Sequence, residues 1–307
     1  MTTVGVGISV YNGAATIGQA LASVAGQTRA PDQVVVVDDG STDGTLPIVE
    51  TWRSVLPLTI VRHGVNRGLS AGRMSAIAEL DTDVILAIDS DDVWLPHHLA
   101  RLLSAYAARP GIVSPMAVAW RPGSPDPIDW RRPLQPKPPA PDLSHLLIMN
   151  WLFSGALFAR TAYYAAGGLY RFVGCEDWDL WLRMLKVDVP VRVLSEPTVL
   201  YRLHGANMSA DDRVLPTEVQ VLETFLDETT DPALRAAAHR SLRHRLARLA
   251  LRSAYDHARD GRSPAARLAA VKALSGPAPV AVRGAAMIVA PRRTVGRRDR
   301  SRGVPVR

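Results

Sequence analysis

Four short, almost continuously apolar segments recur in the first hundred residues, and this repeat restricts the possible folds more than any other feature. They are VGVGISV (4–10), QVVVVD (33–38), LTIV (58–61) and DVILAID (83–89). Unbroken, β-branched runs of this length are typical of strands that are buried on both faces of a parallel sheet. Successive segments end 28, 23 and 28 residues apart, which is the length of one strand-and-helix unit. The repeat therefore predicts a doubly wound, mostly parallel α/β sheet.

Amphipathic helices are expected between these strands, because apolar residues recur there with helical spacing. Asp43 precedes the second helix as a candidate N-cap. The residues expected on the buried faces are Ile17, Ala20, Leu21 and Val24 in the first helix, Leu46, Val49 and Trp52 in the second, and Met74, Ile77 and Ala78 in the third.

The sequence changes character after residue 110. Residues 121–142 contain eight prolines, which no helix or interior strand tolerates, so an extended loop is expected there. From residue 214 onward the pattern indicates mostly helices, with a disordered end from residue 291. The other expected elements are a strand at 154–159, a short helix at 161–168 closed by Gly167 and Gly168, a helix at 176–185 with an acidic first turn, a strand pair at 191–194 and 198–203, and helix breaks near 261–264 and 276–279.

Charge divides the chain into two parts. Residues 1–232 carry 18 basic and 26 acidic side chains, whereas residues 233–307 carry 18 basic and 3 acidic ones. An acidic body can hold a divalent cation, and a basic segment suits an anionic surface such as phospholipid, nucleic acid or a partner protein. The basic segment matches no DNA- or RNA-binding pattern, which argues against a nucleic-acid partner. The alternative is a solvated, Arg-rich face.

A single cysteine, Cys175, excludes a disulfide framework and a cysteine-based zinc cluster. The longest apolar stretch, 146–159, is interrupted by Asn150 and is shorter than the roughly 18 residues that a bilayer span needs. The N-terminus lacks a basic region followed by an apolar one, so no secretion signal is expected. These features predict a cytoplasmic protein.

Acidic residues gather directly after two of the predicted strands. Asp38 and Asp39 end the second strand, and Asp89, Asp91 and Asp92 end the fourth. Ligands of doubly wound sheets bind beyond the carboxyl ends of the strands. Adjacent carboxylates repel each other unless a cation or a hydrogen-bonding ligand is present, and an Asp-x-Asp pair can hold Mg²⁺ or Mn²⁺ while leaving positions for substrate phosphates. The pattern predicts a nucleoside diphosphate ligand, with a turn and helix caps as the alternative.

Seven segments of the chain form a recognisable series. They are TTVGVGISVYNGAATIGQALASVAGQT, VVVVDDGSTDGT, NRGLSAGRMSAI, ILAIDSDDVWLPHHL, SGALFAR, GCEDWDLWLRM and YRLHGANMS. In this order they resemble glycosyltransferase family 2, which consists of inverting enzymes of the GT-A fold. The resemblance extends from about residue 3 to residue 210 and does not include the C-terminal third. It implies a GT-A domain at 1–213, and the sequence pattern and charge beyond this domain predict a basic helical extension at 214–290 and a basic tail at 291–307.

The resemblance also implies a donor-binding half at 1–110 with its own site residues. Asp39, with Asp38 beside it, would accept a hydrogen bond from the ring N–H of the base, and Arg67 would lie beside the base or the diphosphate. Asp91 would bind Mn²⁺ or Mg²⁺, Asp89 would lie near the ribose or the metal, and Asp92 would cap a helix. The residues implied in binding the nucleotide sugar are Val10, Tyr11, Asn12, Asp38, Asp39, Arg67, Asp89 and Ser90.

Four histidines divide by their context in the sequence. His204 follows a predicted strand and resembles a histidine that some family members place on the metal or the diphosphate, with a structural histidine as the alternative. His63, His97 and His98 have no such context, so they are expected at the surface or at caps.

The acceptor half at 111–213 would carry the catalytic base. Inverting transfer needs a carboxylate that takes the proton of the attacking hydroxyl, and the resemblance assigns this role to Asp177. The positive end of the helix dipole would favour its charged form by roughly 0.3–1 kcal/mol. Glu176 is the alternative base or a ligand of acceptor hydroxyls, and helix capping is the alternative for both. Trp178 and Trp181 would form either an acceptor platform or part of the core.

These inferences predict an enzyme that moves a sugar from a nucleotide-diphosphate donor to a hydroxyl of a glycan, glycolipid or small acceptor. A nucleotidyltransferase would carry a Gly-rich segment with a basic residue after the first strand, but no basic residue occurs before Arg29. A non-catalytic binding module that docks through the basic segment is the other alternative. A membrane-bound acceptor would explain that segment as a peripheral contact with anionic lipid at the inner face of the membrane, with 282–291 at the interface.

Overall fold

The computed structural model of the chain describes residues 1–124, 126–134, 142–168, 172–205, 207, 213–260, 264–265 and 268–269. The chain divides into two units, Met1–Asp211 and Asp212–Arg307. Each unit is described by itself.

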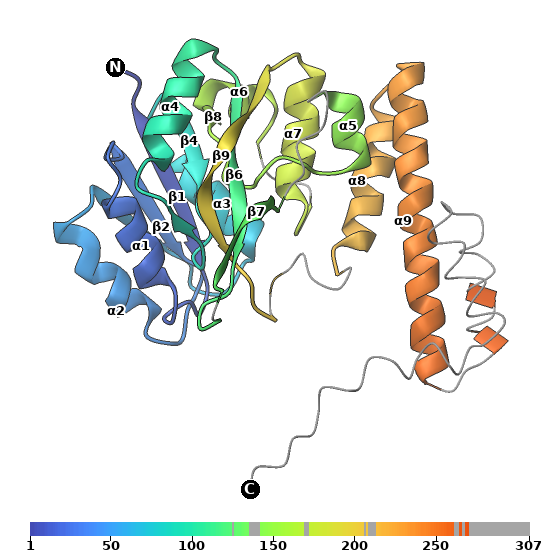
Figure 1. Cartoon of the computed structure of the whole chain (residues 1–307), viewed down its shortest axis with the longest axis horizontal. Helices are drawn as coiled ribbons and strands as arrows, with labels where there is room; N and C mark the ends of the chain where they lie inside the picture. Colours follow the sequence, from blue (N-terminus) through green and yellow to red (C-terminus); the bar gives the residue numbers. More distant parts are fainter. Residues whose placement is uncertain are drawn as a thin grey trace, which may run out of the picture. The chain divides into compact units, whose positions relative to one another are not determined.

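The first unit contains a five-stranded sheet with the order β3-β2-β1-β4-β8 (Figure 1). Its parallel strands are β1 (Val4–Val10), β2 (Gln33–Asp38), β3 (Leu58–Arg62) and β4 (Val84–Ala87). The short strand β8 (Phe158–Ala159) pairs antiparallel with β4. The four predicted strands and the mostly parallel sheet are confirmed. Successive units extend outward from β1 in opposite directions, so the carboxyl ends of β1 and β4 border the place where such sheets bind ligands.

Helices cover both faces of this sheet, which confirms the doubly wound arrangement. The helices that follow its strands are α1 (Ile17–Ala25), α2 (Thr45–Glu50) with a 3₁₀ helix at Thr51–Ser54, α3 (Leu69–Ala78) and α4 (His98–Ala108). Val6 and Ile8 of β1 are buried in one core with residues of α1, α2 and α4. Gly7 faces the other side, where a Cβ atom would lie 3.1 Å from Cβ of Ala76 on α3.

Two predictions about these helices are wrong in detail. Gly44 is the N-cap residue of α2, although Asp43 still accepts a hydrogen bond from the Thr45 N–H at 3.0 Å. On α3, Ala78 was expected to face inward but is exposed. The buried face of that helix instead includes Arg73. The buried face of α3 is therefore rotated around the helix axis from the expected one, and it includes a charged side chain.

A second sheet of the first unit was not predicted. It has the order β5-β9-β6-β7, with β5 (Val93–Trp94), β6 (Ile112–Trp120), β7 (Ile128–Pro133) and β9 (Val191–Arg202). The expected strand pair at 191–194 and 198–203 is the single strand β9, because β6 pairs with it along its length and absorbs the irregular register by a bulge.

The expectation of an extended loop at 121–142 is also wrong in part, because β7 lies within it. This strand pairs on one side with β6 and forms the edge of the second sheet, where proline costs no ladder hydrogen bond. Residues 125 and 135–141 of the loop lie outside the described residues.

Three further helices complete the first unit, namely α5 (Leu143–Ile148), α6 (Arg160–Ala165) and α7 (Glu176–Lys186). The predicted helices α6 and α7 are confirmed, and Gly167 and Gly168 follow α6 with φ of 80° and 73°. The strand expected at 154–159 is limited to β8, since residues 154 and 155 form a turn.

The second unit contains the helices α8 (Leu215–Asp227) and α9 (Pro232–Arg259), as the sequence predicted. Asp231 caps α9 by accepting a hydrogen bond from the Leu234 N–H at 2.9 Å. Arg245 of α9 and Glu218 of α8 form an ion pair at 2.7 Å. The expected break at 276–279, the lipid contact at 282–291 and the tail from 291 lie outside the described residues. Among the helices that the structure describes, none combines the length and the apolar character that a membrane span requires.

His98 is not the surface or cap residue that was expected, although His97 is the exposed N-cap residue of α4. The His98 side chain has 0% exposure, and its ring stacks on Trp94 with centroids 4.2 Å apart. Its Nδ1 atom lies 3.0 Å from Oγ1 of Thr198. Burial lowers the pKa of His98 to about 3. The ring is therefore neutral in the folded protein over the whole physiological range.

This buried imidazole predicts a loss of stability in mild acid. His98 takes up a proton near pH 6.5 in the unfolded chain but only near pH 3 in the folded one. The contribution of neutral, buried His98 to the free energy of unfolding is therefore complete above pH 6.5 and declines as the pH falls. The variant His98→Phe keeps a ring against Trp94 but cannot titrate. Urea unfolding at pH 7.5 and 5.5 should show that the wild type loses about 1 kcal/mol more than this variant. Equal losses would contradict the assignment.

Candidate functional site

The loops after β1 and β2 are bound to each other at the carboxyl edge of the first sheet. Val10 lies level with Asp38, and its carbonyl accepts a hydrogen bond from the Asp39 N–H at 2.8 Å. Asn12 has φ of 50°, and its Oδ1 atom accepts a hydrogen bond from the Thr42 N–H at 2.8 Å. Between them the Tyr11 side chain is 49% exposed. The expected residues of the first loop therefore border an open edge of the sheet.

The carboxylate of Asp39 is already bound by other groups of the chain. It is 2% exposed and accepts hydrogen bonds from the N–H groups of Arg67, at 3.0 and 3.1 Å, and of Gly68, at 2.8 Å. His63 Nδ1 lies 2.5 Å from the same carboxylate, and its Nε2 atom lies 3.0 Å from Oγ of Ser75. The His63 side chain is 5% exposed, so the expected surface position of this residue is wrong. Asp39 anchors the loop before α3, and a base N–H would have to share an acceptor that already has several donors.

Asp38 and Arg67 occupy different positions at this edge. Asp38 is 2% exposed, and its Oδ1 atom accepts a hydrogen bond from the Ser41 N–H at 3.0 Å. Arg67 has an exposed side chain and contributes its backbone N–H to the Asp39 carboxylate. Ser90 is half-buried beside Gly13, where a Cβ atom would lie 3.6 Å from its Oγ. The loops after β1 and β4 are therefore close to each other at Gly13 and Ser90.

The loop after β4 brings Asp91 against His204. The Oδ2 atom of Asp91 lies 2.7 Å from Nε2 of His204, and the two side chains are 29% and 37% exposed. Arg202 fixes the backbone here, since its Nε–H donates to the Asp91 carbonyl at 2.7 Å and its N–H donates to Oδ1 of Asp92 at 3.0 Å. Asp92 is not the expected helix cap, because α4 begins only at His98. Burial raises the pKa of Asp92 well above its ordinary value.

Asp91 and His204 fit a cation that also takes ligands from a substrate. Their carboxylate and imidazole atoms are donors that Mg²⁺ or Mn²⁺ accepts. Across the described ranges, no group of three or more His, Cys, Asp or Glu side chains could hold a metal ion. The chain therefore offers a two-residue site, which suits a cation whose remaining ligands are phosphate oxygens and water. The expected third ligand, Asp89, is engaged elsewhere.

Arg73 connects Asp89 with Glu176. Its Nη2–H donates to Oδ1 of Asp89 at 2.6 Å, and its Nη1–H donates to Oε1 of Glu176 at 2.7 Å. Arg73 is 7% exposed and Glu176 is 2% exposed. The other oxygen of Glu176 accepts a hydrogen bond from the Gly174 N–H at 2.7 Å. Burial opposes the charge of Arg73, but the charges of Asp89 and Glu176 outweigh it and hold the pKa above its ordinary value.

Asp177 follows Glu176 in the first turn of α7. Burial raises its pKa to about 6, the charge of Glu176 adds to this, and the charge of Arg73 acts against it. The Nδ2–H of Asn150 donates to Oδ2 of Asp177 at 3.4 Å. We expected the helix dipole to favour the charged form, but burial beside another carboxylate outweighs it. The carboxylate is consequently ionised at neutral pH and can still accept a proton readily.

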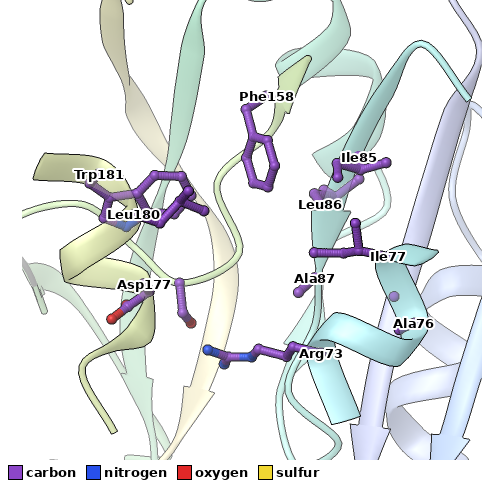
Figure 2. Close-up of a pocket in the computed structure, with 12 residues that line it drawn as sticks. Arg73, Ala76, Ile77, Ile85, Leu86, Ala87, Phe158, Asp177, Leu180 and Trp181 are labelled. Atoms are coloured by element: carbon purple, nitrogen blue, oxygen red, sulfur yellow. The ribbon is translucent and has the colours of Figure 1, made fainter. Parts of the chain in front are cut away.

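A small cavity lies between α7, α3 and β4, and Figure 2 shows Asp177 and Arg73 at one end of it. Its volume, about 20 Å³, is close to that of a single water site. Trp181 lines it and is 1% exposed, while Trp178 is 2% exposed and donates from Nε1 to the Leu146 carbonyl at 2.8 Å. The two tryptophans therefore belong to the core, and the acceptor platform that was the other possibility is wrong.

Sequence reasoning missed Arg73 and misjudged His63, whereas Arg202 was expected to meet phosphate or to order the loop, and it does bind the loop that contains Asp91 and Asp92. Arg73 carried a signal, because its spacing to Ala76 and Ile77 places it on the apolar face of α3. A cation at such a position needs a buried anion, so its presence indicates a carboxylate from another element. His63 gave no comparable signal, because its role is visible only from its contacts with Asp39 and Ser75 in the folded chain.

Comparison with known proteins gives related sequences and folds. The family profile described as "Glycosyl transferase family 2" matches residues 5–159. The "Amylovoran biosynthesis glycosyltransferase AmsE" of Erwinia amylovora is 28% identical over 232 residues, which cover 70% of this chain and 82% of the relative. S. aureus TarS 1-349 in complex with UDP-GlcNAc has a TM-score of 0.65 at 19% identity, covering 95% of this chain and 90% of that one. The mannosyltransferase PcManGT from Pyrobaculum calidifontis, in complex with GDP-Man and Mn²⁺, has a TM-score of 0.63 at 22% identity, covering 95% and 82%.

Proposed function

Since this chain belongs to glycosyltransferase family 2, we propose that it transfers a sugar from a nucleotide-diphosphate donor to a hydroxyl group with inversion at the anomeric carbon. It is a glycosyltransferase, and the GT-A fold expected from its sequence is confirmed by its structural neighbours. One observation carries the proposal furthest. Through two ion pairs of 2.6 and 2.7 Å, Arg73 connects the acidic loop after β4 with the helix that carries Asp177.

The contacts of the two adjacent carboxylates favour Asp177 as the catalytic base over Glu176. Both oxygens of Glu176 are engaged, one by Arg73 and one by the Gly174 N–H. An acceptor hydroxyl at Glu176 would have to compete with both of these donors. Asp177 has a pKa of about 6, which leaves it ionised at pH 7 and close to the value that suits general base catalysis.

The proposed reaction is a single displacement. Asp177 takes the proton of the acceptor hydroxyl as its oxygen forms a bond to the anomeric carbon. The bond between that carbon and the diphosphate oxygen breaks on the opposite face, and its electron pair leaves with the nucleoside diphosphate. Mn²⁺ or Mg²⁺ held by Asp91 and His204 would neutralise the charge that develops on the diphosphate. Asp91 and His204 are therefore the proposed donor-side residues, and Asp177 is the acceptor-side one.

The comparisons support a class of substrates without selecting one member. The neighbours in complex with UDP-GlcNAc and GDP-Man differ in both base and sugar, so the donor is proposed as a nucleoside-diphosphate sugar. The relative named for amylovoran biosynthesis supports a glycan or lipid-linked glycan as acceptor in polysaccharide synthesis. A cytoplasmic location stays a prediction. Contact with anionic lipid also stays a prediction, because residues 282–291 lie outside the described residues.

Thermal unfolding with a panel of nucleoside diphosphates tests the proposal. UDP or GDP should raise the Tm in the presence of Mn²⁺ and much less in its absence, because a ligand that binds only the folded chain stabilises it. If no nucleoside diphosphate raises the Tm with Mn²⁺, the binding-module alternative gains support. Release of pyrophosphate from a sugar donor, in place of a nucleoside diphosphate, would indicate a nucleotidyltransferase.

A further inference from the structure

We propose that Arg73 is a positioning residue, which holds the first turn of α7, and with it Asp177, at a fixed place relative to the acidic loop after β4. This inference rests on the proposed function, because it assigns the donor to that loop and the base to Asp177. Arg73 is not assigned a contact with either substrate.

Arg73 lies on a part of α3 that packs closely against the sheet. Its neighbour Gly72 lies so close to β1 that a Cβ atom would come within 1.9 Å of Oγ of Ser9. Helix α3 is therefore held tightly against the sheet at this point. Ser70, also on α3, donates from Oγ to the Phe172 carbonyl at 3.0 Å, which ties the helix to the segment before α7. Arg73 thus projects from a rigid support.

Both terminal nitrogens of the Arg73 guanidinium donate hydrogen bonds, and they bind carboxylates from different parts of the chain. Asp89 lies 16 residues from Arg73 along the sequence, and Glu176 lies 103 residues away. Each contact is a charge-assisted hydrogen bond of the short kind. Glu176 gives its second oxygen to the Gly174 N–H, so the bend that precedes α7 is fixed by the same side chain. Asp177 is the next residue, and its orientation follows from that of Glu176.

Removal of Arg73 would leave two buried or half-buried carboxylates unpaired beside Asp177. Glu176 would move from its present place, and the first turn of α7 would loosen. Because a displacement of about 1 Å can cost 100-fold in rate, Arg73→Met should lower kcat by about 100-fold. The KM for the donor should change little, since the donor ligands Asp91 and His204 are untouched. Arg73→Lys can hold one carboxylate but not both, so it should restore part of kcat.

The single cysteine offers a readout that does not depend on turnover. Cys175 directly precedes Glu176 and is 4% exposed. Its reaction with a maleimide should be slow in the wild type and at least about 10-fold faster in Arg73→Met, because local opening exposes the thiol. Arg73→Lys should give an intermediate rate. A structural role elsewhere in the molecule would leave this labelling rate unchanged.

Arg183→Met is the matched control. Arg183 lies on α7, about two turns after Glu176, and pairs with the buried carboxylate of Asp179 at 2.9 Å. Its replacement removes a comparable ion pair from α7, so it shows what lower stability alone does. At a temperature where both variants are folded, Arg183→Met should keep the kcat and the Cys175 labelling rate of the wild type.

The experiment measures nucleoside diphosphate release from UDP-GlcNAc and GDP-Man, the Tm with UDP or GDP and Mn²⁺, and the labelling rate of each variant. A wild-type kcat and labelling rate in Arg73→Met would overturn the inference. A raised donor KM with unchanged kcat would also overturn it, because Arg73 would then be a donor ligand. If the wild type neither releases nor binds a nucleoside diphosphate, the proposed function fails, whereas the labelling rates still decide whether Arg73 holds α7.

Discussion

Asp177→Asn is expected to lower turnover by about 1,000-fold while the affinity for the nucleoside diphosphate stays close to that of the wild type. An amide has nearly the same shape as a carboxylate but cannot take a proton from the acceptor hydroxyl. Steady-state rates and a calorimetric titration of UDP or GDP with Mn²⁺ give the two quantities. Asp179→Asn is the matched control, because its carboxylate lies on the same helix and binds Arg183. Full turnover by Asp177→Asn would remove the proposed base.

The same carboxylate determines the acid side of the pH profile. Its pKa of about 6 means that turnover should fall to half near pH 6 and continue to fall below it, because the protonated form cannot act as a base. The residual rate of Asp177→Asn should lack this decline. A wild-type profile that stays flat down to pH 4.5 would show that no carboxylate with a raised pKa controls the rate.

Asp91→Ala is expected to abolish the Mn²⁺-dependent binding of nucleoside diphosphate, and transfer with it. Only Asp91 and His204 are proposed to bind the cation, so the substitution leaves no carboxylate ligand, whereas Mg²⁺ at nucleotide sites is usually held by one or two carboxylates together with substrate phosphates. Calorimetric titration with UDP or GDP, with and without Mn²⁺, measures the effect. Asp81→Ala, which removes a carboxylate that is 83% exposed and pairs with Arg160, serves as control. Undiminished Mn²⁺-dependent binding in Asp91→Ala would contradict the assignment.

The first sheet could be predicted from the sequence because its strands are buried on both faces and need no partner to be recognised. β1 and β2 begin and end at the predicted residues. The second sheet could not be predicted in this way. β5 has two residues and is defined by its pairing of Val93 with Leu200. β7 lies among prolines that are tolerated only because it is an edge strand. These strands depend on pairing between distant parts of the chain, which no local pattern reveals.

The site could be predicted to a similar extent. Asp38, Asp91 and their neighbours stood out because they follow buried strands at the carboxyl edge of a parallel sheet. The partners of the acidic residues could not be predicted from the sequence, because they come from distant parts of the chain. Arg73 and Glu176, for example, are 103 residues apart. The pKa of Asp177 depends on burial by the surrounding elements, and it therefore differs from what its place at a helix N-terminus indicates. The acidic residues could thus be identified from their positions in the sequence, whereas the groups that they bind could be identified only from the folded structure.

The configuration of the sugar that is formed first tests the central claim most directly. If Asp177 activates an acceptor hydroxyl, or a water molecule in its place, on the face opposite to the departing diphosphate, one displacement takes place and the anomeric configuration inverts. Proton NMR in D₂O, recorded within the first minutes after addition of UDP-GlcNAc or GDP-Man, shows which anomer appears before mutarotation. The account predicts the anomer opposite to that of the donor. A first-formed product with the donor's own configuration would contradict it, because retention requires a second displacement through a covalent or otherwise shielded intermediate.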